Sequence, residues 1–350
     1  MTWLTWRQFR PQAIGAAAVV AVLAGLFLMT GPHLAHLYAA SGLAACHSPG
    51  GCPQLASQFL AEAKADSAVP ILFFTGFGIL IALPAIIGAF WGAPMITREL
   101  ESGTYKLAWN QGVSRARWMA VKIGILGLAT MATAGLLSLA FTWWVSPVDK
   151  AGGFPATMTQ LSRLSPEMFA DRGIVPAGWA VFAFVLGVAA GLTIRRTVPA
   201  MAVTLAVAAA LAILWPGLVR SHLMTPRSTT APVTATALSD AIMTHAGEMI
   251  FPVSRPGSPV SLPGAWIVTN RTVTPAGRVF VLPVVAACQT SSLGSPGCDH
   301  WVLSQHLRQT VSYLPASDFW PLQGLETAIL LAAAAGLGAV CTWRVRHVLT

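Results

Sequence analysis

The stretch that decides the fold is VPILFFTGFGILIALPAIIGAFWG, residues 69–92, which contains no charged residue. A helix needs about 20 predominantly apolar residues to cross the hydrocarbon core of a bilayer. Five further stretches meet this requirement. The six predicted spans are residues 12–30, 69–92, 119–145, 175–194, 198–219 and 326–343. The sequence therefore predicts an all-α polytopic membrane protein.

The composition of the whole chain agrees with this prediction. Of 350 residues, 55% are hydrophobic and 9% are charged, and the mean hydropathy is +0.65. Soluble domains carry about 25% charged residues. These values exclude an ordinary soluble enzyme and a disordered chain. The formal net charge of +9 needs its own explanation, because proteins that bind nucleic acid are also basic.

The basic residues gather on one side of the predicted membrane. With the N-terminus inside, the cytoplasmic segments hold eleven basic residues and only two acids, Glu99 and Glu101, while the outer segments balance. The eleven are Arg7, Arg10, Arg98, Lys106, Arg115, Arg117, Lys122, Arg195, Arg196, Arg344 and Arg346. Membrane proteins retain Lys and Arg on the cytoplasmic side. The sequence thus predicts a multi-pass protein of the plasma membrane with both termini cytoplasmic, and no nucleic-acid partner.

The spans divide the chain into four parts. Residues 1–11 precede the first span, and residues 12–219 hold spans one to five with a cytoplasmic loop at 93–118. Residues 220–325 form an outer segment that is long enough for a small folded domain. Residues 326–350 contain the sixth span and a cytoplasmic tail.

The outer segment, residues 220–325, is predicted to be a sizeable α+β insertion between helices five and six. Apolar residues at helical spacing predict helices over 235–250 and 301–314. Alternating apolar and polar residues on both sides of a turn predict a β-hairpin that pairs 266–272 with 278–286.

Four of the five cysteines lie in the predicted outer segments, which face an oxidising environment. Local pairing, Cys46–Cys52 and Cys288–Cys298, is the simplest of the three possible connectivities. Metal binding is the alternative, because a histidine directly follows Cys46 and another lies two residues after Cys298. No C-x-x-C spacing is present, so the sequence favours disulfides and predicts no metal site. The fifth cysteine, Cys341, lies within the last span.

Motifs for catalysis or nucleotide binding are missing from the sequence. It contains no G-x-x-x-x-G-K-[ST], no H-E-x-x-H and no G-x-S-x-G. The span interiors also lack the ionisable residues that proton-driven transporters need. We therefore expect neither enzymatic activity nor a cofactor in this chain, and an amphiphilic or hydrophobic cargo if it is a transporter.

Two glycine pairs have the spacing that allows helices to approach closely, Gly88-x-x-x-Gly92 and Gly187-x-x-x-Gly191. Packing within the chain and packing against a second copy are both compatible with this spacing.

A short polar segment, RELESGT at residues 98–104, follows the second span. It reads as a helix that ends at Gly103, since glycine favours the left-handed conformation there. A cytoplasmic helix with charges of both signs can serve as a docking surface. A solvated loop that only obeys the positive-inside rule is the alternative.

This segment, followed by Leu107-Ala108-Trp109 and Arg117-Trp118, resembles the permease subunits of ABC-2 type ABC transporters, especially those of actinobacteria. The late stretches YLPA (313–316) and FWPLQ (319–323) resemble the same group. The resemblance implies a second permease, identical or paralogous, and two copies of a separate ATPase that binds ATP and Mg. It implies that a coupling helix contacts the ATPase through Arg98, Glu99, Leu100, Glu101, Ser102, Gly103 and Thr104. It also implies that residues 1–11 form an interfacial elbow helix.

We therefore expect the permease subunit of an ATP-driven exporter that moves an amphiphilic or hydrophobic cargo outward. A membrane-anchored extracytoplasmic sensor or interaction protein without transport activity is the alternative. An ATPase that copurifies with the chain would favour the exporter.

Overall fold

The computed structural model describes residues 2–46, 52–103, 114–155, 160–161, 163–244, 247–253, 257–283, 288 and 296–347. Within these residues, six helical segments are long and apolar enough to cross a membrane. They are Phe9–Ala40, Ala68–Ser102, Arg115–Lys150, Val175–Ile194, Thr197–His222 and Ala316–His347. The predicted number of spans is confirmed, and most of the observed helices extend beyond the predicted limits.

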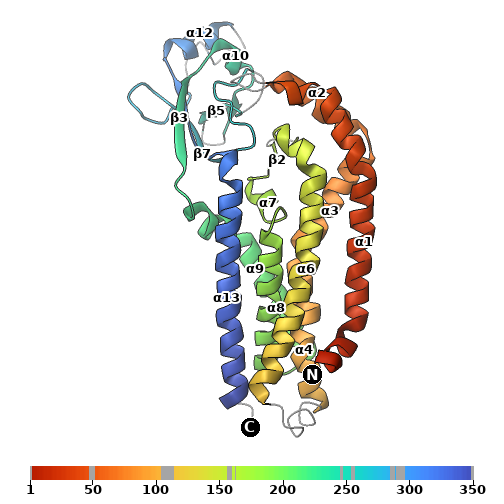
Figure 1. Cartoon of the computed structure of the whole chain (residues 1–350). Coiled ribbons are helices and arrows are strands. Elements are labelled where there is room, and N and C mark those ends of the chain that lie inside the picture. The colour runs from red at the N-terminus through yellow and green to blue at the C-terminus, as the bar shows by residue number, and fades with distance from the viewer. Residues whose placement is uncertain are drawn as a thin grey trace.

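The six spans form one upright bundle (Figure 1). Its long helices are α1 (Thr2–Ala40), α3 (Ala68–Ile87) continued by the π-helical turn η2 (Gly88–Gly92) and α4 (Ala93–Ser102), α6 (Arg115–Lys150), α8 (Val175–Ile194), α9 (Thr197–Leu218) and α13 (Phe319–His347). The short elements between them are η1 (Leu43–Ala45), α2 (Pro53–Ala65), β1 (Phe154–Pro155), β2 (Gln160–Leu161), α7 (Pro166–Phe169), η3 (Arg220–His222) and η4 (Ala316–Asp318). Both termini lie at one end of the bundle, which we call the terminal end. The chain between α9 and α13 folds at the other, the insertion end.

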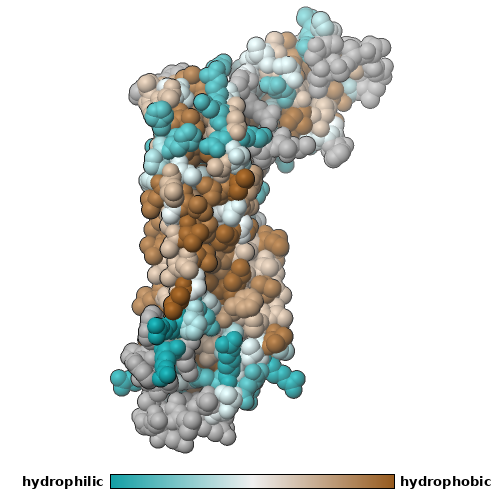
Figure 2. Space-filling view, turned by 90° about the vertical axis from the view of Figure 1, so that its right-hand side faces the viewer, coloured by the Kyte–Doolittle hydropathy of each residue, from teal (hydrophilic) through white to brown (hydrophobic). Residues whose placement is uncertain are grey.

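The surface of the bundle suits a bilayer. Large apolar side chains stand out from the helices, among them Met29 at 81% exposure and Ile213 at 78%. Figure 2 shows them as a hydrophobic band between two hydrophilic zones. Exposing so large an apolar surface to water would be unfavourable, whereas lipid tails solvate it. The helices suit lipid also because their backbone groups hydrogen-bond to one another within each helix.

The two glycine pairs pack against each other within the chain. Gly88 and Gly92 of η2 face α8, where a Cβ on Gly92 would collide with the carbonyl oxygen of Phe184. A Cβ on Gly187 would in turn collide with the carbonyl oxygen of Gly88, and one on Gly191 would lie 2.9 Å from that of Ala93. The backbones touch because no side chain intervenes. Of the two roles open at the sequence level, the structure shows packing within the chain.

The insertion contains a three-stranded antiparallel sheet in the order β3-β7-β6. The strands are β3 (Arg227–Pro232), β6 (Trp266–Val273) and β7 (Arg308–Leu314), and the register places Thr310 opposite both Thr230 and Arg271. The surrounding elements are α10 (Ala235–Leu238), β4 (Ile242–Met243), β5 (Met249–Ile250) and α12 (Pro296–Ser304). The predicted mixture of helix and strand is present.

The predicted elements of the insertion were partly wrong. Among the described residues of the expected helix 235–250, only 235–238 are helical. Of the expected helix 301–314, residues 301–304 belong to α12, whereas 308–314 form the central strand β7. The turn after Val273 exists, with Phe280 N donating to the Thr272 carbonyl at 2.8 Å and a bridge between Val273 and Val279. Among the described residues the long partner of β6 is β7, and residues 284–286 of the expected hairpin lie outside them. Pairing with strands far away in sequence overrode the local helical spacing.

Cys46 is bonded to Cys52 and Cys288 to Cys298, which is the local pairing expected from the sequence. Cys341 is a free thiol buried in α13.

Candidate functional site

The segment expected to couple to an ATPase lies at the terminal end. Residues 93–102 form α4, which carries proline in its first turn and ends at Gly103, whose φ of 70° is the left-handed value expected there. One face of α4 is buried through Ala93, Ile96 and Thr97, whereas Arg98 is exposed. The expected helix is present, and its free face lies at the surface of the bundle.

Glu99 forms an ion pair with Lys122 of α6. The Lys122 side chain is only 4% exposed, and its ammonium group lies 4.7 Å from the centre of the Trp118 ring. A buried ammonium needs a counter-charge. Glu99 supplies that charge and thereby ties α4 to α6.

Glu101 accepts hydrogen bonds from the backbone nitrogen and from Oγ1 of Thr197, both at 2.8 Å. Thr197 is the first residue of α9, where backbone N–H groups lack helical partners and carry partial positive charge. Thr197 Oγ1 also lies 2.8 Å from Thr97 Oγ1. Two residues of α4 therefore hold the beginning of α9.

The N-terminal residues reach the same region. Phe9 is buried, and its ring meets the Trp91 ring edge-on at 4.8 Å between centroids. Thr2–Arg10 continues into the span as part of α1 across Pro11, so residues 1–11 are not a separate element among the residues that the structure describes. The residues of α4 thus contact α6, α8 and α9, and Phe9 of α1 packs on the η2 turn that directly precedes α4.

The expected coupling residues thus divide into groups. Arg98 and Ser102 are exposed, Leu100 packs partly buried against the core, and Gly103 ends the helix. The resemblance implies that Glu99 and Glu101 contact the ATPase, and in the structure each also has a partner within this chain. Thr104 lies outside the described residues. Glu99 faces a buried lysine, and Glu101 faces the N-terminus of α9. Neither partner can be predicted from the sequence, because both come from other helices.

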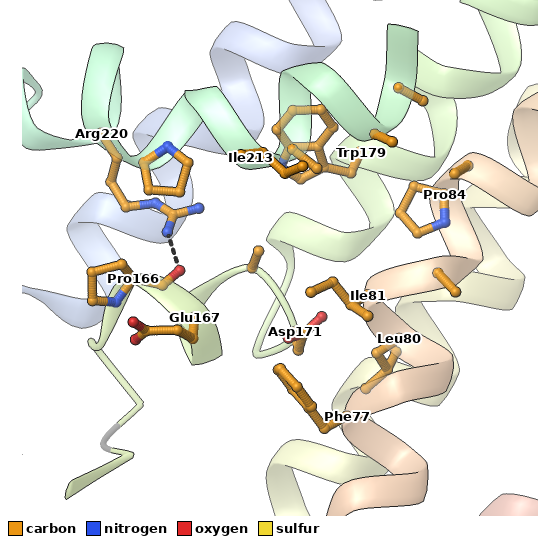
Figure 3. Close-up of a pocket in the computed structure, with 17 residues that line it drawn as sticks. Phe77, Leu80, Ile81, Pro84, Pro166, Glu167, Asp171, Trp179, Ile213 and Arg220 are labelled. Carbon is orange, nitrogen blue, oxygen red and sulfur yellow. Dashed lines mark hydrogen bonds between the residues drawn. The ribbon is translucent and has the colours of Figure 1, made fainter. Parts of the chain in front are cut away.

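A second candidate site is a pocket of 560 Å³ that extends from the insertion end toward the middle of the bundle. Its walls come from α3, α8 and α9, and Pro166 and Glu167 of α7 lie at one end of it beside Arg220 (Figure 3). Ile81 of α3 and Ile213 of α9 stand at its edge with 48% and 78% exposure. Since these residues belong to the apolar band, the pocket opens sideways toward lipid.

Arg220 lines this pocket but is fully engaged in the protein. Its guanidinium donates to both carboxylate oxygens of Glu326 on α13, at 2.8 and 3.0 Å, and to the Pro166 carbonyl at 2.9 Å. Trp179 Nε1 donates to the same carboxylate at 3.3 Å. Arg220 and Glu326 are at most 1% exposed. This two-point ion pair joins α9, α13, α7 and α8 at the insertion end.

Asp171 also lines the pocket and has no such partner. It is 1% exposed, and neither carboxylate oxygen has a hydrogen-bond partner among the described residues. The neighbouring Arg172 is directed elsewhere, with Nη2 3.5 Å from Asp149 Oδ1 and its guanidinium 4.6 Å from the centre of the Phe141 ring. Burial raises the pKa of Asp171 to about 8, although the positive charges of Arg172 and Arg220 oppose the rise.

Sequence reasoning missed this group of buried charges. Arg220 and Glu326 flank the insertion, and Asp171 and Arg172 lie in a short loop just before α8. Each was counted as a loop or boundary residue. The sequence does place these acids and bases directly beside apolar spans. It does not show which of them pair across the bundle.

Comparison with known proteins adds an independent observation. The family model described as "ABC-2 membrane transporter related" matches residues 17–220, which include five of the six spans together with α4 and both glycine pairs. No curated protein matches the chain, and no solved structure matches it. Because the match covers more than half of the sequence, the chain belongs to the ABC-2 membrane transporter related family.

Proposed function

We propose that this chain is the permease subunit of an ATP-driven exporter in the plasma membrane and moves an amphiphilic or hydrophobic cargo outward. The observation that carries the proposal is the family match over residues 17–220, which cover five of the six spans and α4. A separate ATPase docks on the loop 93–118, supplies the sites for ATP and Mg, and acts in two copies. A second permease, identical or paralogous, completes the transporter.

The charge distribution supports an orientation with the terminal end in the cytoplasm. Arg115 and Arg117 begin α6, Arg195 and Arg196 join α8 to α9, and Arg344 and Arg346 stand in the last turn of α13. The insertion with its Cys288–Cys298 disulfide lies at the opposite end (Figure 1), as does the Cys46–Cys52 disulfide between α1 and α2. Positive charge inside and disulfides outside are the arrangement that membrane proteins favour.

Cysteine labelling tests this orientation. Ser228 of β3 and Ser102 of α4 are exposed at opposite ends of the bundle. In sealed cells, a membrane-impermeant maleimide is expected to label Ser228→Cys and to leave Ser102→Cys unlabelled until the cells are permeabilised. Labelling of Ser102→Cys in sealed cells would show that the orientation is reversed.

The contacts of α4 suggest how the work of the ATPase reaches the membrane. Closure of the ATPase pair displaces α4, which is tied to α6 through Glu99 and to α9 through Glu101. The close backbone contact at Gly92 and Gly187 moves α8 with it. These helices then shift as a unit between inward-open and outward-open states.

Two variants separate docking from transmission. Arg98→Glu reverses an exposed charge on the free face of α4 and is expected to weaken ATPase binding about tenfold or more, because like charges across an interface repel. Glu101→Ala removes the cap on α9 and is expected to leave ATPase binding intact while cargo-stimulated ATP hydrolysis is lost. Both quantities are measured on the reconstituted complex.

Glu62→Arg is the matched control, since Glu62 is an exposed acid of α2 at the insertion end. It is expected to change neither binding nor hydrolysis. If Arg98→Glu keeps full coupled activity, α4 is not the docking element, and its role is limited to packing against the neighbouring helices.

A further inference from the structure

We propose that the pocket between α3, α8 and α9 binds a lipophilic cation, with Asp171 as its counter-ion and the apolar walls around its hydrocarbon part. This inference rests on the proposed transport function and names the class of cargo that the pocket would accept. It follows from three observations: the charge left over in the pocket, the nature of its walls and the direction of its opening.

When the buried charges that the structure describes at the insertion end are matched in pairs, Asp171 remains without a partner. Among the described residues at the insertion end, buried Arg220 pairs with Glu326, and buried Arg172 lies 3.5 Å from Asp149 without a hydrogen bond. Asp171 is left without a hydrogen-bond partner among the described residues. A buried carboxylate without a partner is costly, and a bound cation would remove that cost. An anion in the pocket would meet Asp171, while Arg220, the base that lines the pocket, is already paired with Glu326.

The walls determine the rest of the ligand. Phe77, Leu80, Ile81 and Pro84 of α3 face alanine residues of α9 across the pocket, with Trp179 of α8 between them. Figure 3 shows Asp171 beside Leu80 and Ile81, and Arg220 on the far side of the pocket. A pocket of 560 Å³ with mostly apolar walls and few charged groups has the size and character of a site for a drug-sized molecule.

The opening favours entry from the membrane. Because Ile81 and Ile213 at the edge face the apolar band, a ligand can move from the lipid into the pocket between α3 and α9. Glu167 of α7, exposed at the upper end of the pocket, adds a second negative charge there. An amphiphile would then lie with its cationic group at the insertion end and its apolar part along the helices.

Two ions of the same shape and opposite charge test the proposal. The full-length protein in phosphatidylcholine nanodiscs is titrated by equilibrium dialysis with tetraphenylphosphonium or with tetraphenylborate, and uptake by empty nanodiscs is subtracted. We expect saturable binding of the cation, and Asp171→Asn should weaken it about tenfold or more, the effect of about 1.4 kcal/mol. Equal saturable binding of both ions, or an unchanged cation affinity in Asp171→Asn, would overturn the proposal.

Two further variants locate the site. Ala212→Phe adds a ring to an exposed pocket-lining position of α9 and should block the cation without disturbing the core. Glu62→Gln removes an acid elsewhere at the insertion end and should leave binding unchanged. If Ala212→Phe dissociates a dimer of this chain and leaves cation binding intact, a second copy occupies the pocket and the proposal is wrong.

The pH dependence provides a separate signature. Burial raises the pKa of Asp171 to about 8, so the empty pocket holds a largely neutral carboxyl at pH 7. A cation binds the ionised form, and its affinity should therefore rise as the pH rises from 6 to 9, but not in Asp171→Asn. The other charged groups around Asp171 are Glu167 of α7, Arg172 next to it, Arg220 of η3, Glu326 of α13 and Asp149 of α6.

Binding in nanodiscs needs no ATPase, so the two proposals fail separately. Loss of coupling in the α4 experiment would leave the cation result standing. Absence of cation binding would exclude this class of cargo at the pocket and leave the docking of an ATPase on α4 unaffected.

Discussion

Gly187→Ala is expected to prevent normal assembly of the bundle, although it adds a single methyl group. The new Cβ would lie against the carbonyl oxygen of Gly88 and 2.8 Å from the backbone nitrogen of Ala93. Real Cβ atoms essentially never come closer than 3.0 Å to such atoms. Both neighbours are backbone atoms, so α8 must separate from the η2–α4 segment.

Overpacking in a core costs about 1–3 kcal/mol when side chains can move aside. Here no side chain can give way, and we expect a loss of about 3 kcal/mol or more. The measurement is the recovery of monodisperse protein in detergent, together with its thermal unfolding temperature. Gly92→Ala should behave in the same way, because its Cβ would meet the carbonyl oxygen of Phe184.

Gly124→Ala and Gly336→Ala are the matched controls. Both glycines lie inside long helices, α6 and α13, and an added Cβ would meet nothing within 4 Å. Alanine is favoured over glycine inside a helix by about 0.5–1 kcal/mol, so the controls should be neutral or slightly stabilising. If Gly187→Ala is as stable as Gly124→Ala, the close approach of α8 to η2 is not present in the folded protein.

Glu326→Met is expected to destabilise the protein by about 3–5 kcal/mol, because it leaves the Arg220 guanidinium buried without its counter-charge. Arg220 is 1% exposed, and its remaining hydrogen bond goes to the Pro166 carbonyl. The free energy of unfolding in mixed micelles measures the loss. The double variant Arg220→Met with Glu326→Met removes both charges and should recover much of the lost stability. Replacing a buried ion pair by apolar residues of similar volume often leaves the free energy of unfolding unchanged.

Asp318→Asn provides the comparison, because Asp318 forms the exposed counterpart of this pair. It lies 3.9 Å from Arg227, whose side chain is 63% exposed. Exposed ion pairs contribute about 0–1 kcal/mol. If Glu326→Met costs no more than Asp318→Asn, the Arg220–Glu326 pair does not hold the insertion end together.

The buried pair and the glycine contact act at different levels of the bundle. Glu326 joins the ends of α9 and α13 near the insertion, whereas Gly88 and Gly92 set the distance between the second span and α8 toward the terminal end. Between them lies the pocket that contains Asp171. Helices held firmly at two levels can open and close a lateral pocket between those levels without separating, as an alternating-access mechanism requires.

The sequence by itself determined the membrane-spanning part of the protein. A stretch such as residues 69–92 is identified as a span from its own composition, because the cost of placing a segment in lipid is close to a sum over its residues. The pairing of Cys46 with Cys52 is local for a similar reason, since few residues separate them. The resemblance carried by residues 98–104 led to the same family that the match over residues 17–220 shows.

Only the tertiary structure decided which residues become partners. Residues 308–314 have helical spacing, yet they form a strand because β3 and β6, distant in sequence, pair with both of its edges. The hydrogen bonds of Glu101 to Thr197 at the start of α9 could not be predicted, because they join residues far apart in the sequence. Asp171 is a candidate ligand group because Arg220, the base that lines the same pocket, is paired with Glu326 from another helix. Each outcome depends on groups that come together from different helices or strands. A short stretch of sequence does not show which distant residue will contact it.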